Sequence, residues 1–168
     1  PIQLCLMPAQ IANGGYKIYP NIFMEDNEKN EPKDKFTQLF KSSTNIKIVQ
    51  DAMFGSTNEV MGTSYRSRID DPIYQFAGKT GTSQVKRITE RERELDLKTF
   101  EIPYEERDHA LYVAFGPYKS PRYALSVVVE HGGNGSTTAA PMAKKLFKLI
   151  IDRHSIRESI KKDRYMDT

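Results

Sequence analysis

The sequence has one cysteine, no long apolar run and no clear excess of either charge. The single cysteine, Cys5, excludes a disulfide framework and a cysteine-based zinc site. No stretch approaches the roughly 18–20 apolar residues of a membrane span, and the amino terminus lacks the basic-then-apolar pattern of a signal peptide. The 25 basic and 22 acidic residues are interleaved, with a net charge of +3. This balance does not favour nucleic acid or an anionic membrane as a partner.

What the sequence does contain is enough apolar side chain for a core. Hydrophobic residues make up 38% of the 168 residues, which excludes global disorder and fits a single domain. The polar segment 155–168 is expected to be a tail behind a domain that covers residues 1–154. The chain opens with a proline and not with a methionine, so we expect it to begin within a longer protein.

Glycines and helical spacing divide the first half of the chain. A short helix is expected over residues 7–13, closed by Gly14-Gly15, because glycine takes the left-handed conformation that ends helices. A second helix is expected over residues 45–54, stopped at Gly55. Between these helices the sequence predicts a short strand over residues 16–19 and an exposed loop over residues 24–38.

The second half predicts a sheet and one long helix. A strand is expected over residues 73–85, followed by a charged segment, 86–108, that could hold a short helix at 89–92. Two apolar, β-rich runs form an antiparallel hairpin over residues 110–115 and 123–129, with both strands central and covered by helices. A helix with Ala143, Leu146, Phe147, Ile150 and Ile151 on its buried face is expected over residues 139–154. The fold class is therefore α+β, an antiparallel sheet covered by helices.

The segment Lys79-Thr80-Gly81-Thr82 is the one whose residue types suggest chemistry. Lysine supplies positive charge, the threonine hydroxyls donate hydrogen bonds, and glycine lets a ligand approach the backbone closely. Four such residues in a strand would form an anion-binding surface. Taken alone, the tripeptide also fits an exposed strand edge with a solvated lysine.

Five segments in order resemble class B penicillin-binding proteins, and among them the elongation type. The motif Lys79-Thr80-Gly81 corresponds to the third sequence motif of penicillin-recognising serine enzymes. The resemblance implies the fold that penicillin-binding proteins share with serine β-lactamases. Residues 1–154 would then be the carboxyl-terminal part of a transpeptidase domain. The similar segments are residues 8–15 (PAQIANGG), 73–85 (IYQFAGKTGTSQV), 108–117 (DHALYVAFGP), 123–135 (YALSVVVEHGGNG) and the helix start at 139–141 (AAP).

The sequence departs from this family where the nucleophile is expected. The family carries an S-x-x-K motif and then S-x-N or S-x-D, both well before K-T-G. Here the matches at Ser83–Lys86, Ser159–Lys162 and Ser43–Asn45 stand in the wrong order or place, and we interpret them as coincidental. The expected nucleophile and its lysine base are therefore missing, so the chain is expected to be an inactive fragment when taken alone.

The resemblance implies peptidoglycan cross-linking through an acyl-serine intermediate, with stem peptides and β-lactams as ligands. It assigns catalytic roles to Lys79, beside the nucleophile, and to Thr82, whose backbone N–H would be one oxyanion donor. Thr80 and Thr82 would bind the substrate carboxylate, with Lys79 and Gly81 in the same binding surface. No metal and no cofactor is implied. The parent, meaning the longer protein to which this chain would belong, would act at the periplasmic face of the inner membrane. Its partners would be membrane-embedded proteins of cell-wall elongation.

Several alternatives remain open from the sequence. Within the same fold, the motif strand also fits a D,D-carboxypeptidase, a serine β-lactamase or a non-catalytic penicillin receptor. In another class, a small α+β binding module could hold a phosphate at the turn 132–135, although that turn lacks the Walker pattern and favours a tight structural turn. An inactive truncated product is the third option. His109 is expected to be structural, and His131 and His154 lack neighbours at metal-ligand spacing.

Overall fold

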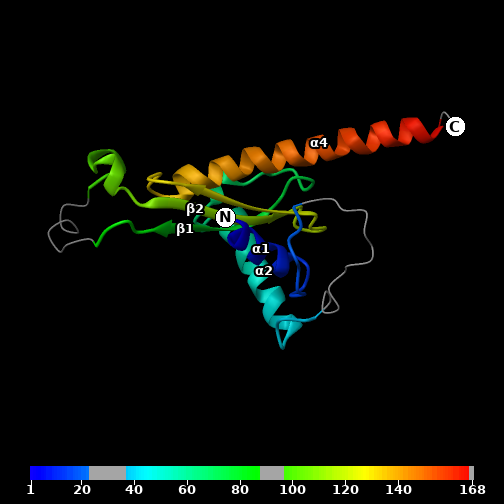
Figure 1. Ribbon diagram of the computed structural model, residues 1–168, viewed down its shortest axis with the longest axis horizontal. Coiled ribbons are helices and arrows are strands. Elements are labelled where there is room, and N and C mark those ends of the chain that lie inside the picture. The colour runs from blue at the N-terminus through cyan, green and yellow to red at the C-terminus, as the bar shows by residue number, and fades with distance from the viewer. Residues whose placement is uncertain (23–36, 88–96, 167–168) are drawn as a thin grey trace.

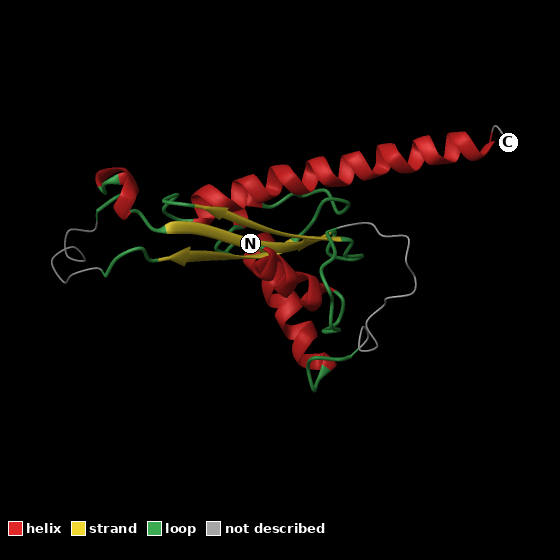
Figure 2. Cartoon of the chain, viewed as in Figure 1, coloured by secondary structure: helices red, strands yellow, loops and turns green. Residues whose placement is uncertain are grey.

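The computed structural model describes residues 1–22, 37–87 and 97–166, with side chains described up to residue 155. It is α+β, as the sequence predicted (Figures 1 and 2). The helices and strands are α1 (Ile2–Ala12), α2 (Ser43–Asn58), β1 (Ala77–Ser83), β2 (His109–Gly116), β3 (Tyr123–Val129) and α4 (Ala140–Met166), with a 3-10 turn η2 (Tyr65–Ser67) and a π-helical turn η5 (Gly135–Ala139).

The three strands form an antiparallel sheet in the order β1-β2-β3. Lys79 stands opposite Val113 in the register of β1 with β2, and Thr82 stands opposite Ala110. The sheet lies between two helical layers: α4 packs on one face, and α1 and α2 pack on the other (Figure 1). The predicted hairpin is confirmed, and β2 is central as expected, whereas β3 lies at a border of the described sheet.

Each face of the sheet has its own core, because successive strand residues point to opposite faces. On the α4 side, Phe76 stacks on Phe147 with ring centroids 4.8 Å apart, and Tyr112 is fully buried beside them. On the α2 side, Ala77 and Phe115 pack against Met53. Burial of a side chain of this size typically stabilises a fold by about 1.5–3 kcal/mol, so the two cores fix β1 from both sides.

Several predicted boundaries were wrong. Residues 16–19 form no strand, because only Tyr16 pairs, in an isolated bridge with Gln38. The second helix continues through Gly55 to Asn58, since packing of Met53 and Thr57 against the sheet outweighs the roughly 1 kcal/mol penalty of a helical glycine. The strand predicted from residue 73 starts at Ala77, because the chain first turns back on the carbonyl of Asp71.

The last helix also differs from its prediction. It begins at Ala140 and runs to Met166, past the predicted end near residue 154, and its second half extends beyond the sheet (Figure 1). Ala143, Phe147 and Ile151 are buried as expected, but Leu146 is 41% exposed. Among the described residues, no helix is long and apolar enough to cross a membrane. The predicted helix at 89–92 and nearly all of the predicted loop at 24–38 lie outside the described residues.

Candidate active site

The candidate residues lie on β1, and hydrogen bonds define which way its backbone groups point. The N–H of Gly78 donates to Thr57 Oγ1 at 3.1 Å, and Asn58 Nδ2 donates to the carbonyl of Phe76 at 3.0 Å. Both bonds lie on the side of β1 away from β2, which we call the outer edge. Because this direction alternates along a strand, the N–H and C=O groups of Thr80 and Thr82 also point to the outer edge. A ligand lying along β1 could therefore accept from the Thr82 N–H.

Four polar side chains meet at this edge. Lys79 Nζ donates to the Thr80 carbonyl at 3.0 Å and lies 3.4 Å from the Thr80 hydroxyl. The Thr80 hydroxyl is in turn 3.3 Å from that of Thr63, which lies 3.2 Å from the hydroxyl of Ser56. The structure thus brings Lys79 and Thr80 together and adds Thr63 and Ser56. Sequence reasoning missed these two residues because they precede the motif by many positions and belong to no recognisable pattern.

Thr82 and Gly81 stand further along the same strand. Thr82 is exposed, and the strand alternation places its side chain on the same face as that of Thr80. A Cβ added to Gly81 would meet only Leu111 Cβ, at 3.4 Å, so the glycine is not required by packing. Its small size leaves the face beside Lys79 uncovered, which is what close approach of a ligand requires.

A cavity of about 400 Å³ opens beside Lys79, between that strand and α2. The helix and the turn that follows it contribute the acidic groups of Asp51 and Glu59, and β1 contributes the positive charge of Lys79. Such a mixed lining can hold water or a polar part of a ligand next to the lysine ammonium. The polar residues that line the cavity are Asp51, Ser56, Glu59, Thr63 and Lys79.

A buried network of hydroxyl groups connects β1 to α2 and to the central strand β2. The Thr57 hydroxyl lies 2.9 Å from that of Tyr112, and the Ser64 hydroxyl lies 3.0 Å from the same phenol. Burial raises the pKa of Tyr112, since charging the phenol would require desolvating it. A Cβ added to Gly78 would lie 2.3 Å from the Tyr112 hydroxyl. The phenol can therefore reach the outer edge only because the residue before Lys79 is a glycine.

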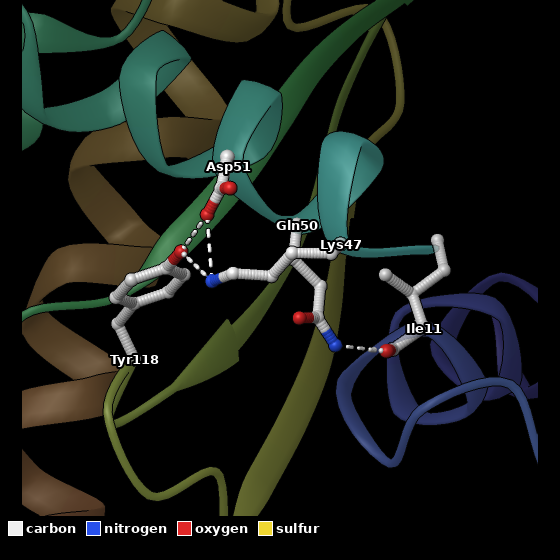
Figure 3. Close-up of polar contacts among 5 residues, drawn as sticks. All are labelled: Ile11, Lys47, Gln50, Asp51 and Tyr118. Carbon is white, nitrogen blue, oxygen red and sulfur yellow. Dashed lines mark hydrogen bonds and ion pairs between the residues drawn. The ribbon is translucent and has the colours of Figure 1, made fainter. Parts of the chain in front are cut away.

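Polar contacts also join α2 to the loop of the hairpin and to α1. Lys47 Nζ contacts Asp51 at 2.8 Å and the Tyr118 hydroxyl at 3.1 Å, and Tyr118 also donates to Asp51 (Figure 3). These two donors lower the pKa of Asp51, with Lys47 as the larger cause. Gln50 Nε2 donates to the carbonyl of Ile11 at 2.7 Å, which joins α2 to α1. These contacts position the helix that borders the candidate site.

The glycine-rich turn is a packed structural element. A Cβ on Gly135 would lie 2.5 Å from the carbonyl oxygens of both Gly81 and Leu111, so the turn packs directly on β1 and β2. Asn134 Oδ1 accepts from the Ser136 N–H at 2.8 Å and caps the turn. Residues 132–135 therefore form a tight turn packed against the sheet, and not the phosphate-binding loop that the sequence left open as an alternative.

The histidines at this end of the sheet contact each other. His109 Nδ1 accepts from the His131 N–H at 2.9 Å, and the His131 ring packs edge-on against the His109 ring. Both histidines therefore contribute to packing and hydrogen bonding at this end of the sheet. The part of the chain that the structure describes has no cluster of three or more His, Cys, Asp or Glu side chains that could hold a metal.

The chain is similar to known proteins over most of its length. Residues 1–148 match the family model described as the penicillin binding protein transpeptidase domain. The peptidoglycan D,D-transpeptidase MrdA of Salmonella typhimurium is 33% identical over 158 residues, which cover 90% of this chain and 25% of that protein. The chain thus spans about a quarter of the length of the curated relatives it matches.

Two solved structures are similar over most of the chain. Pseudomonas aeruginosa PBP2, in complex with WCK 5153, gives a TM-score of 0.69 at 30% identity and covers 89% of this chain and 30% of its own. Helicobacter pylori PBP2, in complex with MreC, gives a TM-score of 0.70 at 28% identity and covers 90% of this chain and 24% of its own.

Proposed function

The chain belongs to the penicillin-binding protein transpeptidase family, and from that membership we propose that it forms one wall of the active site of an elongation-type peptidoglycan D,D-transpeptidase. One observation carries this proposal. Lys79, the Thr80 hydroxyl and the outward backbone of Thr82 lie together along one strand edge. That edge offers positive charge, hydroxyl donors and a backbone N–H in a line that a peptide could follow.

In the proposed reaction, a serine oxygen attacks the carbonyl carbon of the penultimate D-Ala of a stem peptide. The C–N bond to the terminal D-Ala breaks, and D-Ala leaves after its nitrogen takes up a proton. The amine of a neighbouring stem peptide then attacks the acyl-serine ester, forms the cross-link and returns the proton to the serine. A β-lactam would acylate the same serine through its strained amide.

The residues of β1 have separate roles in this scheme. Lys79 places a positive charge and a hydrogen-bond donor beside the serine. The Thr82 N–H donates to the oxyanion of the tetrahedral intermediate, and loss of one such donor typically costs about 3–4 kcal/mol in transition-state stabilisation. The hydroxyls of Thr80 and Thr82 bind the substrate carboxylate, and Gly81 keeps the strand accessible.

The acylated serine is proposed to come from polypeptide outside these 168 residues. Ser83 ends β1 with its side chain on the face opposite Thr82. Ser43 opens α2 after the segment 8–15, whereas the family pattern places its S-x-N motif before that segment. Ser159 lies within the last helix, far beyond the motif in sequence. This placement supports a shared site in which the present chain supplies the substrate-binding strand.

The setting of the reaction follows from the same proposal. A transpeptidase of this type acts on peptidoglycan, so we place the parent protein at the periplasmic face of the bacterial inner membrane. Its partners would include membrane-associated proteins of cell-wall elongation. The structure of the H. pylori relative in complex with MreC supports a protein partner of this kind.

The decisive test uses the natural polypeptide that carries these residues. It should react covalently with a fluorescent penicillin, and the Lys79→Ala variant should react at least tenfold more slowly, because a charge-assisted hydrogen bond is typically worth about 1.5–3 kcal/mol. Lys79→Arg should restore the rate only in part, since a planar guanidinium does not replace a compact ammonium. Reaction of Lys79→Ala at the normal rate would remove Lys79 from the mechanism, and no reaction of the natural polypeptide would refute the function.

A further inference from the structure

We propose a second anion-binding site, next to Thr80. It holds a carboxylate of the peptide substrate other than the one that the hydroxyls of Thr80 and Thr82 bind. It is a cavity of about 720 Å³ between η2, the turn 136–137 and the first turns of α4. We call it the basic cavity, and it is within the size range of small-ligand sites. This inference rests on the proposed function, because that function supplies a peptide with several carboxylates.

Charge is the first argument. Four cationic side chains line the basic cavity, Arg66 from η2 and Lys144, Lys145 and Lys148 from α4, and no carboxylate lines it among the described residues. Nor is any of the four in an ion pair within the described part of the chain. Like charges four residues apart on a helix, such as Lys144 and Lys148, repel each other. An anion between them would relieve this repulsion, and a cleft with charge of one sign attracts such ligands.

Position is the second argument. Thr63 lines the basic cavity and also lies 3.3 Å from the Thr80 hydroxyl. The same residue lines the cavity beside Lys79. A ligand held at Thr80 therefore has the basic cavity as its immediate neighbour, separated by one side chain.

The walls favour an organic acid. Besides the cations, Ser136, Thr137 and Thr63 offer hydroxyls, and Val60, Tyr65 and Pro141 offer apolar surface. Hydroxyls and ammonium groups bind a carboxylate, and the apolar surface suits the carbon chain that bears it. In a peptide the anionic groups are carboxylates, so the basic cavity is assigned to a side-chain or branch carboxylate of a stem peptide.

The site is tested on the 168-residue chain itself, with tricarballylate as the probe. In an NMR titration, the backbone signals of Arg66, Ser136, Thr137 and Lys144 should shift and saturate in the low millimolar range, about 1–10 mM. The trimethyl ester of the probe, which is neutral, should not produce saturable shifts. The variant Lys144→Gln/Lys145→Gln should weaken binding about tenfold, as expected when charged donors are lost.

A matched control separates a site from general charge. Lys41 and Lys119 are exposed and lie outside the basic cavity, so Lys41→Gln/Lys119→Gln changes the net charge equally. That variant should bind the probe within about twofold of the original chain, since distant surface charges are screened. Equal weakening in both variants, or shifts that do not saturate, would overturn the site. This result is independent of penicillin labelling, so a failure of the basic cavity and a failure of the proposed function can be told apart.

Discussion

The hydroxyls of Thr57 and Tyr112 lie 2.9 Å apart in the protein interior, at the point where the end of α2 meets β1. Thr57 also accepts from the Gly78 N–H at 3.1 Å, so one side chain joins the helix, the strand with K-T-G and the central strand. Both residues are fully buried. Satisfied networks of this kind fix one arrangement, because any loss leaves a buried polar group without a partner.

Thr57→Val is therefore expected to destabilise the chain. It keeps the shape of the side chain but leaves the Gly78 N–H and the Tyr112 hydroxyl short of a partner, which typically costs about 1–3 kcal/mol. Thr57→Ser keeps the hydroxyl and should lose less. Chemical denaturation of the two variants measures the difference. If valine is tolerated as well as serine, the hydroxyl network does not hold the strand in place.

The two glycines around Lys79 are expected to respond differently to alanine. Gly78→Ala places a Cβ 2.3 Å from the Tyr112 hydroxyl and should destabilise the fold by about 1–3 kcal/mol, the usual range for overpacking. Gly81→Ala places its Cβ at an ordinary 3.4 Å from Leu111 and should leave stability nearly unchanged. In the natural polypeptide, however, Gly81→Ala should slow reaction with penicillin.

Denaturation midpoints and labelling rates of the same two variants check this separation. A Gly81→Ala variant that is stable and also fully reactive would show that the Cβ does not obstruct the ligand. A Gly78→Ala variant as stable as the original chain would show that the phenol does not lie against this glycine.

The elements that follow local rules were predictable from sequence. Two apolar runs with a Gly-Pro turn between them predicted the hairpin, and the motif strand followed from its small residues and its resemblance. The helix ends were less predictable. Gly55 is helical against its low propensity, whereas the residues after His154 are mostly good helix formers whose polarity led us to expect a tail. In the first case tertiary packing outweighs propensity.

The support of the site depends on contacts far apart in sequence. Thr57 meets Tyr112 across 55 residues, and Thr63 meets Thr80 across 17. A lone threonine or serine carries no periodicity that would reveal such a partner. The basic cavity is similar in this respect, because Arg66 and Lys144 come together only when η2 packs against α4.

Thr82→Val is expected to affect carboxylate recognition more than the acyl transfer itself. Valine keeps the shape and the backbone N–H of residue 82 but removes one hydroxyl donor to the anion. In the natural polypeptide, acylation by β-lactam acids should slow about tenfold, as for loss of a hydrogen bond to a charged group. Neutral esters of the same β-lactams serve as the control and should change little. If esters and acids slow equally, the hydroxyl does not bind the carboxylate.

Asp51 is expected to titrate at lower pH than an ordinary aspartate, because Lys47 and Tyr118 donate to it and lower its pKa. Since the folded-state pKa lies below the unfolded one, near 4, the contacts stabilise the fold above about pH 4. This contribution is lost as the pH falls through the folded-state pKa. The stability difference between the original chain and Asp51→Asn should therefore shrink in acid.

An NMR titration of the carboxyl carbons measures this pKa directly. Lys47→Met keeps the length of the side chain but removes its charge, so the pKa of Asp51 should rise in that variant. Identical titration curves in the two proteins would show that the pair does not form in solution.

The 168-residue chain by itself is expected to form no covalent adduct with penicillin. Acylation requires a serine within about 2.6–3.2 Å of its base and facing the oxyanion donors. Ser83, the serine nearest the motif in sequence, ends β1 and stands opposite His109, and alternation directs its side chain to the face opposite Thr82. Ser43 starts α2, at the opposite end of that helix from Ser56, and has no lysine three residues later, since position 46 is an isoleucine.

Intact mass spectrometry after long incubation with excess benzylpenicillin provides the measurement. The mass should remain that of the unmodified chain, while a full-length relative such as the Salmonella MrdA protein, treated in parallel, should gain one penicilloyl group. A stoichiometric adduct that maps to a single serine of this chain would identify that serine as the nucleophile. The proposal that the nucleophile lies outside these residues would then have to be abandoned, because β1 and its own serine would form a complete site.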